Sequence, residues 1–257
     1  MPFTPHAAVN VTLQELLDGA QAILGDEFVG LYLYGSLASG DFNPATSDLD
    51  FLVVTAGVRP AETVRALEAL HTRLWAEGAY WAAHLEGAYQ PRQALRRRDP
   101  RSAPVPQVNE GHFYLAQEGS DWVIQRRVLR EHGLVVAGPA PATLIDPVTP
   151  DEVRWAVAAV LREWWAQALV DPAFLRRTNY QAYAVLTMCR ALVALEHGAI
   201  LSKPAAARWA RDALDPRWRS LIDEAVAARP GVDMGRVDEI VELIRYTLER
   251  SRGASEG

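Results

Sequence analysis

One segment near the N-terminus constrains the fold more than any other part of this 257-residue chain. Residues 31–55 read LYLYGSLASGDFNPATSDLDFLVVT, in which two apolar runs enclose a polar loop that begins at Gly35-Ser36. Asp48 and Asp50 stand at the head of the second run, and residues two apart on a strand project from the same face. The pattern predicts two strands, with a pair of carboxylates held across from a Gly-Ser turn.

This arrangement points to a particular chemistry. Two carboxylates that are forced together repel each other unless a divalent cation lies between them, and the turn could hold a phosphate. Magnesium-dependent phosphoryl or nucleotidyl transfer needs such a pair. A Gly-Ser turn and an Asp-x-Asp pair each occur by chance in solvated loops, but the combination between two apolar runs is much less common. Fold and activity remain separate hypotheses.

Composition narrows the class of protein. Apolar residues make up 49% and charged residues 23%, which is typical of a chain with an ordinary soluble core. The net charge of −6 argues against a protein that coats nucleic acid. The single cysteine, Cys189, allows no intrachain disulfide, and its helical neighbours predict a packing role. The start lacks the pattern of a signal peptide, and no apolar run is long enough to span a bilayer, so we expect a cytoplasmic protein.

The first half of the chain alternates between helical and strand patterns. A capping box, Thr12-Leu13-Gln14-Glu15, predicts the start of a first helix. Residues 99–119 are rich in Pro, Gly and polar types and allow no assignment. The alternation of helices and strands indicates an α/β fold. The predicted elements after the first helix are strands over 29–34, 51–55 and 81–89, and helices over 59–75 and 121–132.

The second half reads as helices only. Four prolines between residues 138 and 150 predict a domain boundary, which gives domains 1–146 and 147–257. Thr149-Pro150-Asp151-Glu152 offers an N-cap, a proline at the first helical position and a glutamate for a capping box. Five helices with short connections predict a helical bundle. They cover residues 151–169, 180–197, 203–214, 218–227 and 235–251.

A third carboxylate, Glu86, lies in the strand predicted over 81–89. If that strand pairs beside the strand of Asp50, Glu86 faces the same side and could take a proton as a general base. The alternative is an ordinary solvated residue, and the spacing does not decide between them.

In the helical half, Lys203 stands at a helix start, where the helix dipole disfavours a cation unless an anion meets it. Arg190 lies in a long helix among apolar neighbours. The simpler interpretation of Lys203 is a solvated side chain. The simpler interpretation of Arg190 is a side chain whose apolar stem covers apolar surface.

A resemblance to a known family adds to these hypotheses. The Gly-Ser turn followed by Asp-x-Asp resembles the signature of the polymerase β-type nucleotidyltransferases. The chain also resembles the aminoglycoside adenylyltransferases that modify streptomycin and spectinomycin. The motifs are scattered over nearly the full length. They are YGS at 34–36, SDLD at 47–50, LEGAY at 85–89, MCRAL at 188–192 and GAILSKPAAARWA at 198–210.

The resemblance implies a role for each matching residue. Asp48 and Asp50 would hold two magnesium ions, and Glu86 would be the catalytic base. Arg190 and Lys203 would grip the triphosphate of ATP. The family's acceptor surface, which includes a tryptophan and acidic residues, matches less well here. The corresponding positions are aromatic without a tryptophan: Phe113, Tyr114, Tyr180 and Tyr183.

The implied fold is an α/β nucleotidyltransferase domain with a small mixed sheet, followed by an all-α helical bundle domain. The implied enzyme is a monomeric, magnesium-dependent antibiotic-resistance enzyme of the streptomycin 3''-adenylyltransferase type. It would bind ATP between its domains, with Gly35 and Ser36 at the phosphates. It would transfer AMP to a hydroxyl of an aminoglycoside or related small molecule and release pyrophosphate. We expect no membrane or nucleic-acid partner. Two alternatives remain open: adenylylation of a protein or RNA, and a non-catalytic nucleotide-binding sensor.

Overall fold

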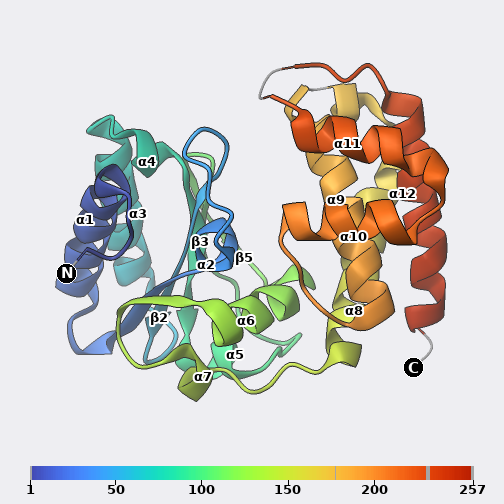
Figure 1. Ribbon diagram of the computed structural model, residues 1–257. Coiled ribbons are helices and arrows are strands. Elements are labelled where there is room, and N and C mark those ends of the chain that lie inside the picture. Colours follow the sequence, from blue (N-terminus) through green and yellow to red (C-terminus); the bar gives the residue numbers. More distant parts are fainter. Residues whose placement is uncertain (1, 177, 230–231, 256–257) are drawn as a thin grey trace. The chain divides into compact units, whose positions relative to one another are not determined.

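The computed structural model describes residues 2–176, 178–229 and 232–255 (Figure 1). The contacts divide the chain into two compact units. The sheet unit comprises the residues up to Glu118 together with Gln125–Pro147, and the helical unit comprises Gly119–Ile124 together with the residues from Val148 onward. The division into domains 1–146 and 147–257 concerns which parts of the chain fold independently. It stays a prediction.

The sheet unit is built on a mixed sheet of six strands, in the order β5-β4-β3-β2-β1-β6. Strands β2 and β3 run parallel, whereas every other neighbouring pair in this sheet is antiparallel. The predicted small mixed sheet is thus confirmed. The strands are β1 Phe28–Leu33, β2 Leu49–Thr55, β3 Leu85–Pro91, β4 Val105–Asn109, β5 His112–Ala116 and β6 Leu134–Ala137.

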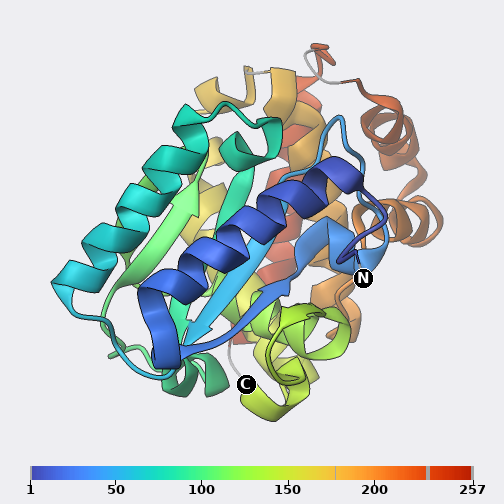
Figure 2. The ribbon, with the colours of Figure 1, turned by 90° about the vertical axis from the view of Figure 1, so that its left-hand side faces the viewer.

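Two long helices, α1 (Ala7–Leu24) and α3 (Ala61–Ala76), cover one face of this sheet (Figure 2). Their apolar stripes and the facing strand residues form a single buried cluster. Burial of such stripes is the main force that fixes helices on a sheet. The shorter helices of the sheet unit are a 3-10 turn at Gly25–Glu27, α2 Gly35–Ser39, α4 Tyr80–Ala83, α5 Arg92–Arg96 and α7 Pro141–Leu144. Helix α6 (Asp121–His132) belongs to the sheet unit from Gln125 onward, whereas its first turn belongs to the helical unit.

The start of α1 corrects one prediction. The helix begins at Ala7 after His6, and its N-cap lacks a side-chain cap hydrogen bond, so the capping box predicted at Thr12 is wrong. Thr12 is buried inside the helix. The reason is Val9, which is fully buried and extends the apolar stripe of Leu13 toward the N-terminus. Packing of this extra turn outweighs the local capping signal.

The predicted strand over 81–89 is also partly wrong. Residues Tyr80–Ala83 form the short helix α4, and the strand begins only at Leu85. Trp81 and Ala82 are apolar and buried, and so short an apolar stretch fits a strand and a short helix equally well. The stretch that allowed no assignment holds the hairpin of β4 and β5. Its turn residues Glu110 and Gly111 both have positive φ, at 47° and 74°.

The helical unit is a bundle, as predicted. The capping box of α8 is confirmed, because Thr149 Oγ1 accepts from Glu152 N at 3.2 Å and the Glu152 carboxylate accepts from Thr149 N at 2.7 Å. The helix predicted to follow it changes to π-helical and then 3-10 hydrogen bonding. The elements are α8 Pro150–Val160, a π-helix at Leu161–Trp165, 3-10 turns at Ala166–Leu169, Ala173–Arg176, Pro216–Trp218 and Arg252–Ser255, and the helices α9 Thr178–His197, α10 Lys203–Ala213, α11 Arg219–Ala227 and α12 Val237–Ser251.

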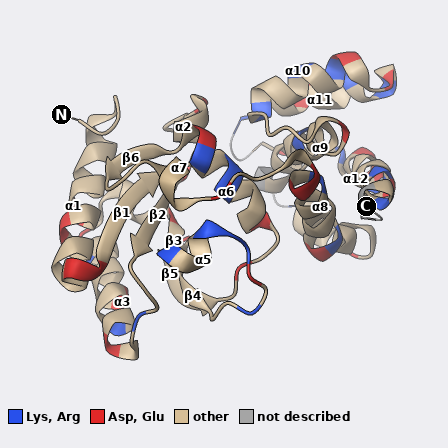
Figure 3. Ribbon diagram, turned by 90° about the horizontal axis from the view of Figure 1, so that it is seen from below, with Lys and Arg blue, Asp and Glu red and all other residues tan. Residues whose placement is uncertain are grey.

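Charged residues are spread over both units. Figure 3 shows acidic and basic residues interspersed along the helices of each. Within the described ranges, each helix is too short or too polar to cross a lipid bilayer.

Candidate active site

The turn after β1 brings backbone against a carboxylate. Gly35 begins α2 with a φ of +62°, and a Cβ at this position would lie 1.8 Å from Asp50 Oδ2. Tyr34 N donates to the Asp50 carbonyl oxygen at 3.2 Å, which fixes β1 and β2 in register at this point. A residue with a side chain could not occupy position 35 without moving Asp50. Glycine is therefore required by a close approach as well as by its left-handed φ.

Asp50 and Glu86 are brought side by side by the parallel pairing of β2 and β3. They are direct partners in the register, as are the preceding residues Leu49 and Leu85. Both leucines are buried, while both carboxylate residues are only partly buried, so the acidic pair shares the other face. Asp48 lies just before β2 and is exposed. The condition set by the sequence for Glu86, that its strand pairs with the Asp-bearing strand, is met.

The atoms around this pair fit phosphate and a hard cation. Ser36 Oγ is buried and makes no hydrogen bond to any residue in the described part of the chain. A buried hydroxyl without a partner is costly, and a phosphate oxygen would accept its hydrogen bond. The carboxylates of Asp48 and Asp50 are the ligand type that magnesium prefers, together with substrate phosphates.

Protein groups alone do not complete a metal site. Among the residues that the structure describes, no three or more His, Cys, Asp or Glu side chains gather closely enough to hold an ion. Magnesium is commonly held by one or two carboxylates, with phosphate oxygens and water supplying the remaining ligands. Asp48 and Asp50 therefore fit a cation that arrives with a nucleotide.

The face that carries Glu86 continues across β4 and β5. Ala88 pairs with Gln107, and Gln107 pairs with Tyr114, whose hydroxyl donates to Gln107 Oε1 at 3.4 Å. The Pro-, Gly- and polar-rich composition of residues 99–119 does not predict this hairpin. Two short alternating runs joined by Glu110-Gly111 were the signal that could have revealed it.

In the helical unit, Arg190 and Lys203 come together locally. Arg190 Nε, on α9, donates to the Leu201 carbonyl oxygen at 3.1 Å, two residues before Lys203 begins α10. Lys203 Nζ lies 5.1 Å from the centre of the Tyr183 ring. The two cations predicted from the sequence thus stand at one place in this unit.

Two buried ionisable groups belong to the cores. Burial raises the pKa of Cys189 to about 12, in keeping with the predicted packing role. Burial lowers the pKa of His71 to about 4, and His71 Nε2 makes a 2.8 Å hydrogen bond with the Tyr89 hydroxyl. Tyr89 is three residues beyond Glu86 on the same strand, so it faces the layer of α1 and α3 instead of the acidic pair.

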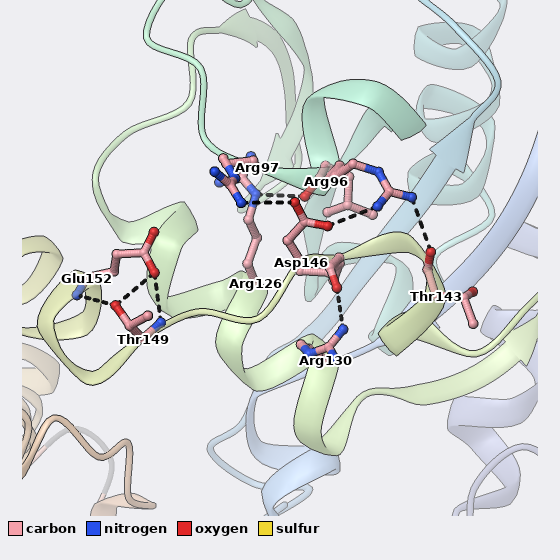
Figure 4. Close-up of polar contacts among 10 residues, drawn as sticks. Arg96, Arg97, Arg126, Arg130, Thr143, Asp146, Thr149 and Glu152 are labelled. Atoms are coloured by element: carbon pink, nitrogen blue, oxygen red, sulfur yellow. Dashed lines mark hydrogen bonds and ion pairs between the residues drawn. The ribbon is translucent and has the colours of Figure 1, made fainter.

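Three arginines of the sheet unit hold the chain segment before Pro147 in place. Arg96 and Arg97 pair with Asp146 at 2.9 and 3.3 Å, and Arg130 donates to the Ala142 and Ile145 carbonyl oxygens (Figure 4). These contacts attach the segment before Pro147 to the rest of the sheet unit. Arg96, Arg97 and Arg130 therefore have a structural role.

A buried ion pair stabilises the same region. Arg126 donates to the Leu95 carbonyl oxygen at 2.8 Å and pairs with Glu118 at 2.6 Å. The side chains of Arg126 and Glu118 are only 2% and 3% exposed.

Two family models match the chain. The model described as a nucleotidyltransferase domain matches residues 15–86, which include Gly35, Asp50 and Glu86. The model described as the C-terminal domain of aminoglycoside adenylyltransferase matches residues 143–250, which include Arg190 and Lys203.

Individual proteins resemble the chain over nearly its full length. The aminoglycoside (3'') (9) adenylyltransferases of Klebsiella pneumoniae and Escherichia coli are each 27% identical, over 259 and 260 residues, covering 93% of this chain and 94% of theirs. The crystal structure of spectinomycin adenyltransferase AAD(9) from Enterococcus faecialis with ATP and spectinomycin shares the fold. Its TM-score is 0.72 at 17% identity, with 94% of this chain and 98% of that one covered. The match of both family models, with relatives that span both units, shows that the chain is a nucleotidyltransferase of the aminoglycoside adenylyltransferase family.

Proposed function

We propose that this enzyme transfers AMP from ATP to a hydroxyl group of an aminoglycoside or related small molecule. The observation that carries the proposal is the pairing of Asp50 with Glu86 across two parallel strands, with Gly35 directly against Asp50. Asp50, Glu86 and the turn at Gly35 lie close together, which supports roles for them as a cation ligand, a general base and a phosphate-binding turn. The acceptor class is supported by relatives that are named aminoglycoside (3'') (9) adenylyltransferases.

Different residues of the chain would have different roles in binding ATP and magnesium. Asp48 and Asp50 would hold two magnesium ions, which, when bound, neutralise phosphate charge and orient the triphosphate. Ser36 would donate its hydrogen bond to a phosphate oxygen, beside the backbone of Gly35. Arg190 and Lys203 would contact phosphate oxygens with charge-assisted hydrogen bonds.

Glu86 would act on the acceptor. Its carboxylate accepts the proton of the acceptor hydroxyl as that oxygen attacks the α-phosphorus of ATP. The bond from the α-phosphorus to the bridging oxygen breaks as the new phosphorus–oxygen bond forms, and pyrophosphate leaves. One proton passes to Glu86 and one AMP group passes to the acceptor, so atoms and charge balance.

The acceptor and the roles of the carboxylates can be tested together. Purified enzyme would be incubated with labelled ATP, magnesium and a panel that includes streptomycin, spectinomycin and other aminoglycosides. We expect labelled AMP on one or more of these compounds, with pyrophosphate released in equal amount. Modification of the 3'' hydroxyl of streptomycin would establish the finer specificity. Transfer to a protein or RNA, with none to the panel, would contradict the proposed acceptor class.

Two variants separate the metal site from the base. Asp50→Asn removes a cation ligand while keeping the shape, and should abolish pyrophosphate release at saturating ATP. Glu86→Gln should still bind ATP and magnesium but lose roughly 10²–10⁴-fold in rate, the usual worth of general acid–base catalysis. Asp26→Asn, at an exposed position in the turn before β1, is the control and should leave turnover unchanged. Near-normal turnover in Glu86→Gln would mean that Glu86 is an ordinary strand residue.

A further inference from the structure

The backbone of Lys203 is held firmly at the start of α10. Ser202 is the N-cap, and its Oγ accepts from Ala205 N at 3.4 Å. Just before it, the Leu201 carbonyl oxygen accepts from Arg190 Nε at 3.1 Å. These contacts fix the Cα of Lys203, so the position of its ammonium depends on how the side chain itself is held.

Lys203 is an unusual cation in this chain. It is the only lysine, because every other one of the 26 basic residues is arginine. A lysine side chain has a flexible four-carbon stem and a compact ammonium, and it loses considerable rotamer freedom when it is fixed. The helix start offers it no electrostatic support, since the dipole there is positive. A contact elsewhere must therefore direct the ammonium.

The Tyr183 ring makes a contact of this kind. Lys203 Nζ lies 5.1 Å from the ring centre, within the range of about 6 Å in which the ring attracts a cation. Trp165 stacks on the same ring, with 5.9 Å between the ring centres, and is only 7% exposed. Tyr180 meets the same ring edge-on at 6.1 Å.

The support comes from an irregular part of the bundle. Trp165 ends the π-helical segment Leu161–Trp165, in which wider turns change the direction in which side chains point. Its neighbour Trp164 is 70% exposed, whereas Trp165 is buried against Tyr183. Tyr183 remains 45% exposed, so the supported ring still offers surface to Lys203.

We propose that Tyr183 is a positioning residue for Lys203, and that its ring holds the ammonium ready to meet the phosphates of ATP. This inference rests on the proposed role of Lys203 in ATP binding. An ammonium that is already held loses less conformational freedom when ATP binds, which strengthens binding. The phenol hydroxyl has no part in the effect, so phenylalanine should replace Tyr183 and leucine should not.

The contact can be observed directly in the enzyme without ATP. Isotope-labelled lysine supplied during expression labels a single side chain, and a nearby ring shifts the NMR signals of its ε-methylene protons. We expect the shift in wild type and in Tyr183→Phe, and its loss in Tyr183→Leu. Unshifted signals in wild type would overturn the inference, because the ring would then not hold the side chain.

The effect on binding can be measured by titrating ATP with magnesium into the same variants. Tyr183→Leu should weaken ATP binding by about 2–5-fold, the equilibrium effect of a partly exposed cation–π contact, and Tyr183→Phe should not change it. Tyr183→Leu should have no further effect in a Lys203→Ala background. The control is Tyr246→Leu, because Tyr246 on α12 carries a similar contact with Arg250 at 5.2 Å. This control should leave ATP affinity unchanged.

The outcomes separate this inference from the proposed function. If Lys203→Ala weakens ATP binding but Tyr183→Leu does not, the nucleotide role of Lys203 stands and the positioning role of Tyr183 is wrong. If Lys203→Ala binds ATP as well as wild type does, the nucleotide role is wrong and the positioning inference falls with it. A weakening by Tyr183→Leu that persists in the Lys203→Ala background would also overturn the inference. It would mean that the ring acts through packing.

Discussion

At the scale of single residues, the absence of one side chain at Gly35 determines where a carboxylate lies. The sequence predicted Gly35, Asp48 and Asp50 as a group because their spacing and their flanking apolar runs are local signals. It could not predict the contact between Lys203 and Tyr183. The two residues lie on different helices, and only the packing of the bundle brings them together.

Gly35→Ala tests the close approach. Both Gly35→Ala and the control Gly25→Ala introduce a side chain at positive φ, which costs on the order of 1–3 kcal/mol of folding free energy. Only at position 35 would the new Cβ collide with Asp50, because nothing lies within 4 Å of a Cβ at position 25. We expect Gly35→Ala to lose nearly all turnover and Gly25→Ala to keep it. Thermal unfolding and pyrophosphate release measure the two effects, and equal activities would contradict the role assigned to Gly35.

At the scale of elements, local sequence signals predicted helix starts correctly where they agreed with side-chain packing. The capping box of Thr149 and Glu152 predicted the start of α8 correctly, whereas Thr12 lies inside α1 because buried Val9 extends that helix. The π-helical segment after α8 has no sequence signature, since it differs from an α-helix only in hydrogen bonding. Pairing between distant strands, which brings Glu86 beside Asp50, could be stated only as a condition.

Within α6, two neighbouring arginines should differ greatly in importance. Arg126→Met leaves Glu118 buried without its partner and should destabilise the protein by ~3–5 kcal/mol. Arg127→Met removes a partly exposed ion pair with Glu131, in which the two side chains are 25% and 41% exposed, and should cost less than ~1 kcal/mol. Denaturant unfolding of both variants measures the difference. Similar losses would mean that burial does not govern the strength of these pairs.

The buried contact between His71 on α3 and Tyr89 on β3 predicts that the stability of the protein depends on pH. The pKa of His71 is lowered by burial from 6.5 to about 4, so the unfolded chain binds its proton at a higher pH than the folded protein does. The contribution of neutral His71 is therefore complete above pH 6.5 and is lost as the pH falls from about 6.5 to about 4, to an extent of ~3 kcal/mol. Replacing the exposed His112 by glutamine is the control. Denaturant unfolding across this range should show a flatter pH profile for His71→Gln than for wild type and His112→Gln.

At the scale of the whole molecule, the proposed ligands of ATP come from both units. Asp48 and Asp50 belong to the sheet unit, whereas Arg190 and Lys203 belong to the helical unit. If one ATP molecule contacts residues of both, its binding should alter how the acceptor binds. Coupling between two ligands is typically ~1–3 kcal/mol, and it acts equally in both directions.

Calorimetry can measure this coupling. Acceptor would be titrated with and without ATP and magnesium, using wild type and Lys203→Ala. We expect tighter acceptor binding in the presence of ATP, and a smaller gain in Lys203→Ala because ATP itself binds more weakly there. Equal acceptor affinity in all four titrations would show that nucleotide and acceptor bind independently.

The parallel pairing of β2 and β3 has a further consequence for how the chain acquires activity during folding. Glu86 follows Asp50 by 36 residues, and the crossover between their strands includes α3 and α4. Closing such a connection costs chain entropy before the strand contacts can repay it, so parallel pairing tends to be slow. The two carboxylates should thus meet late, after α3 has docked. Recovery of enzyme activity on refolding should lag behind the recovery of helical signal.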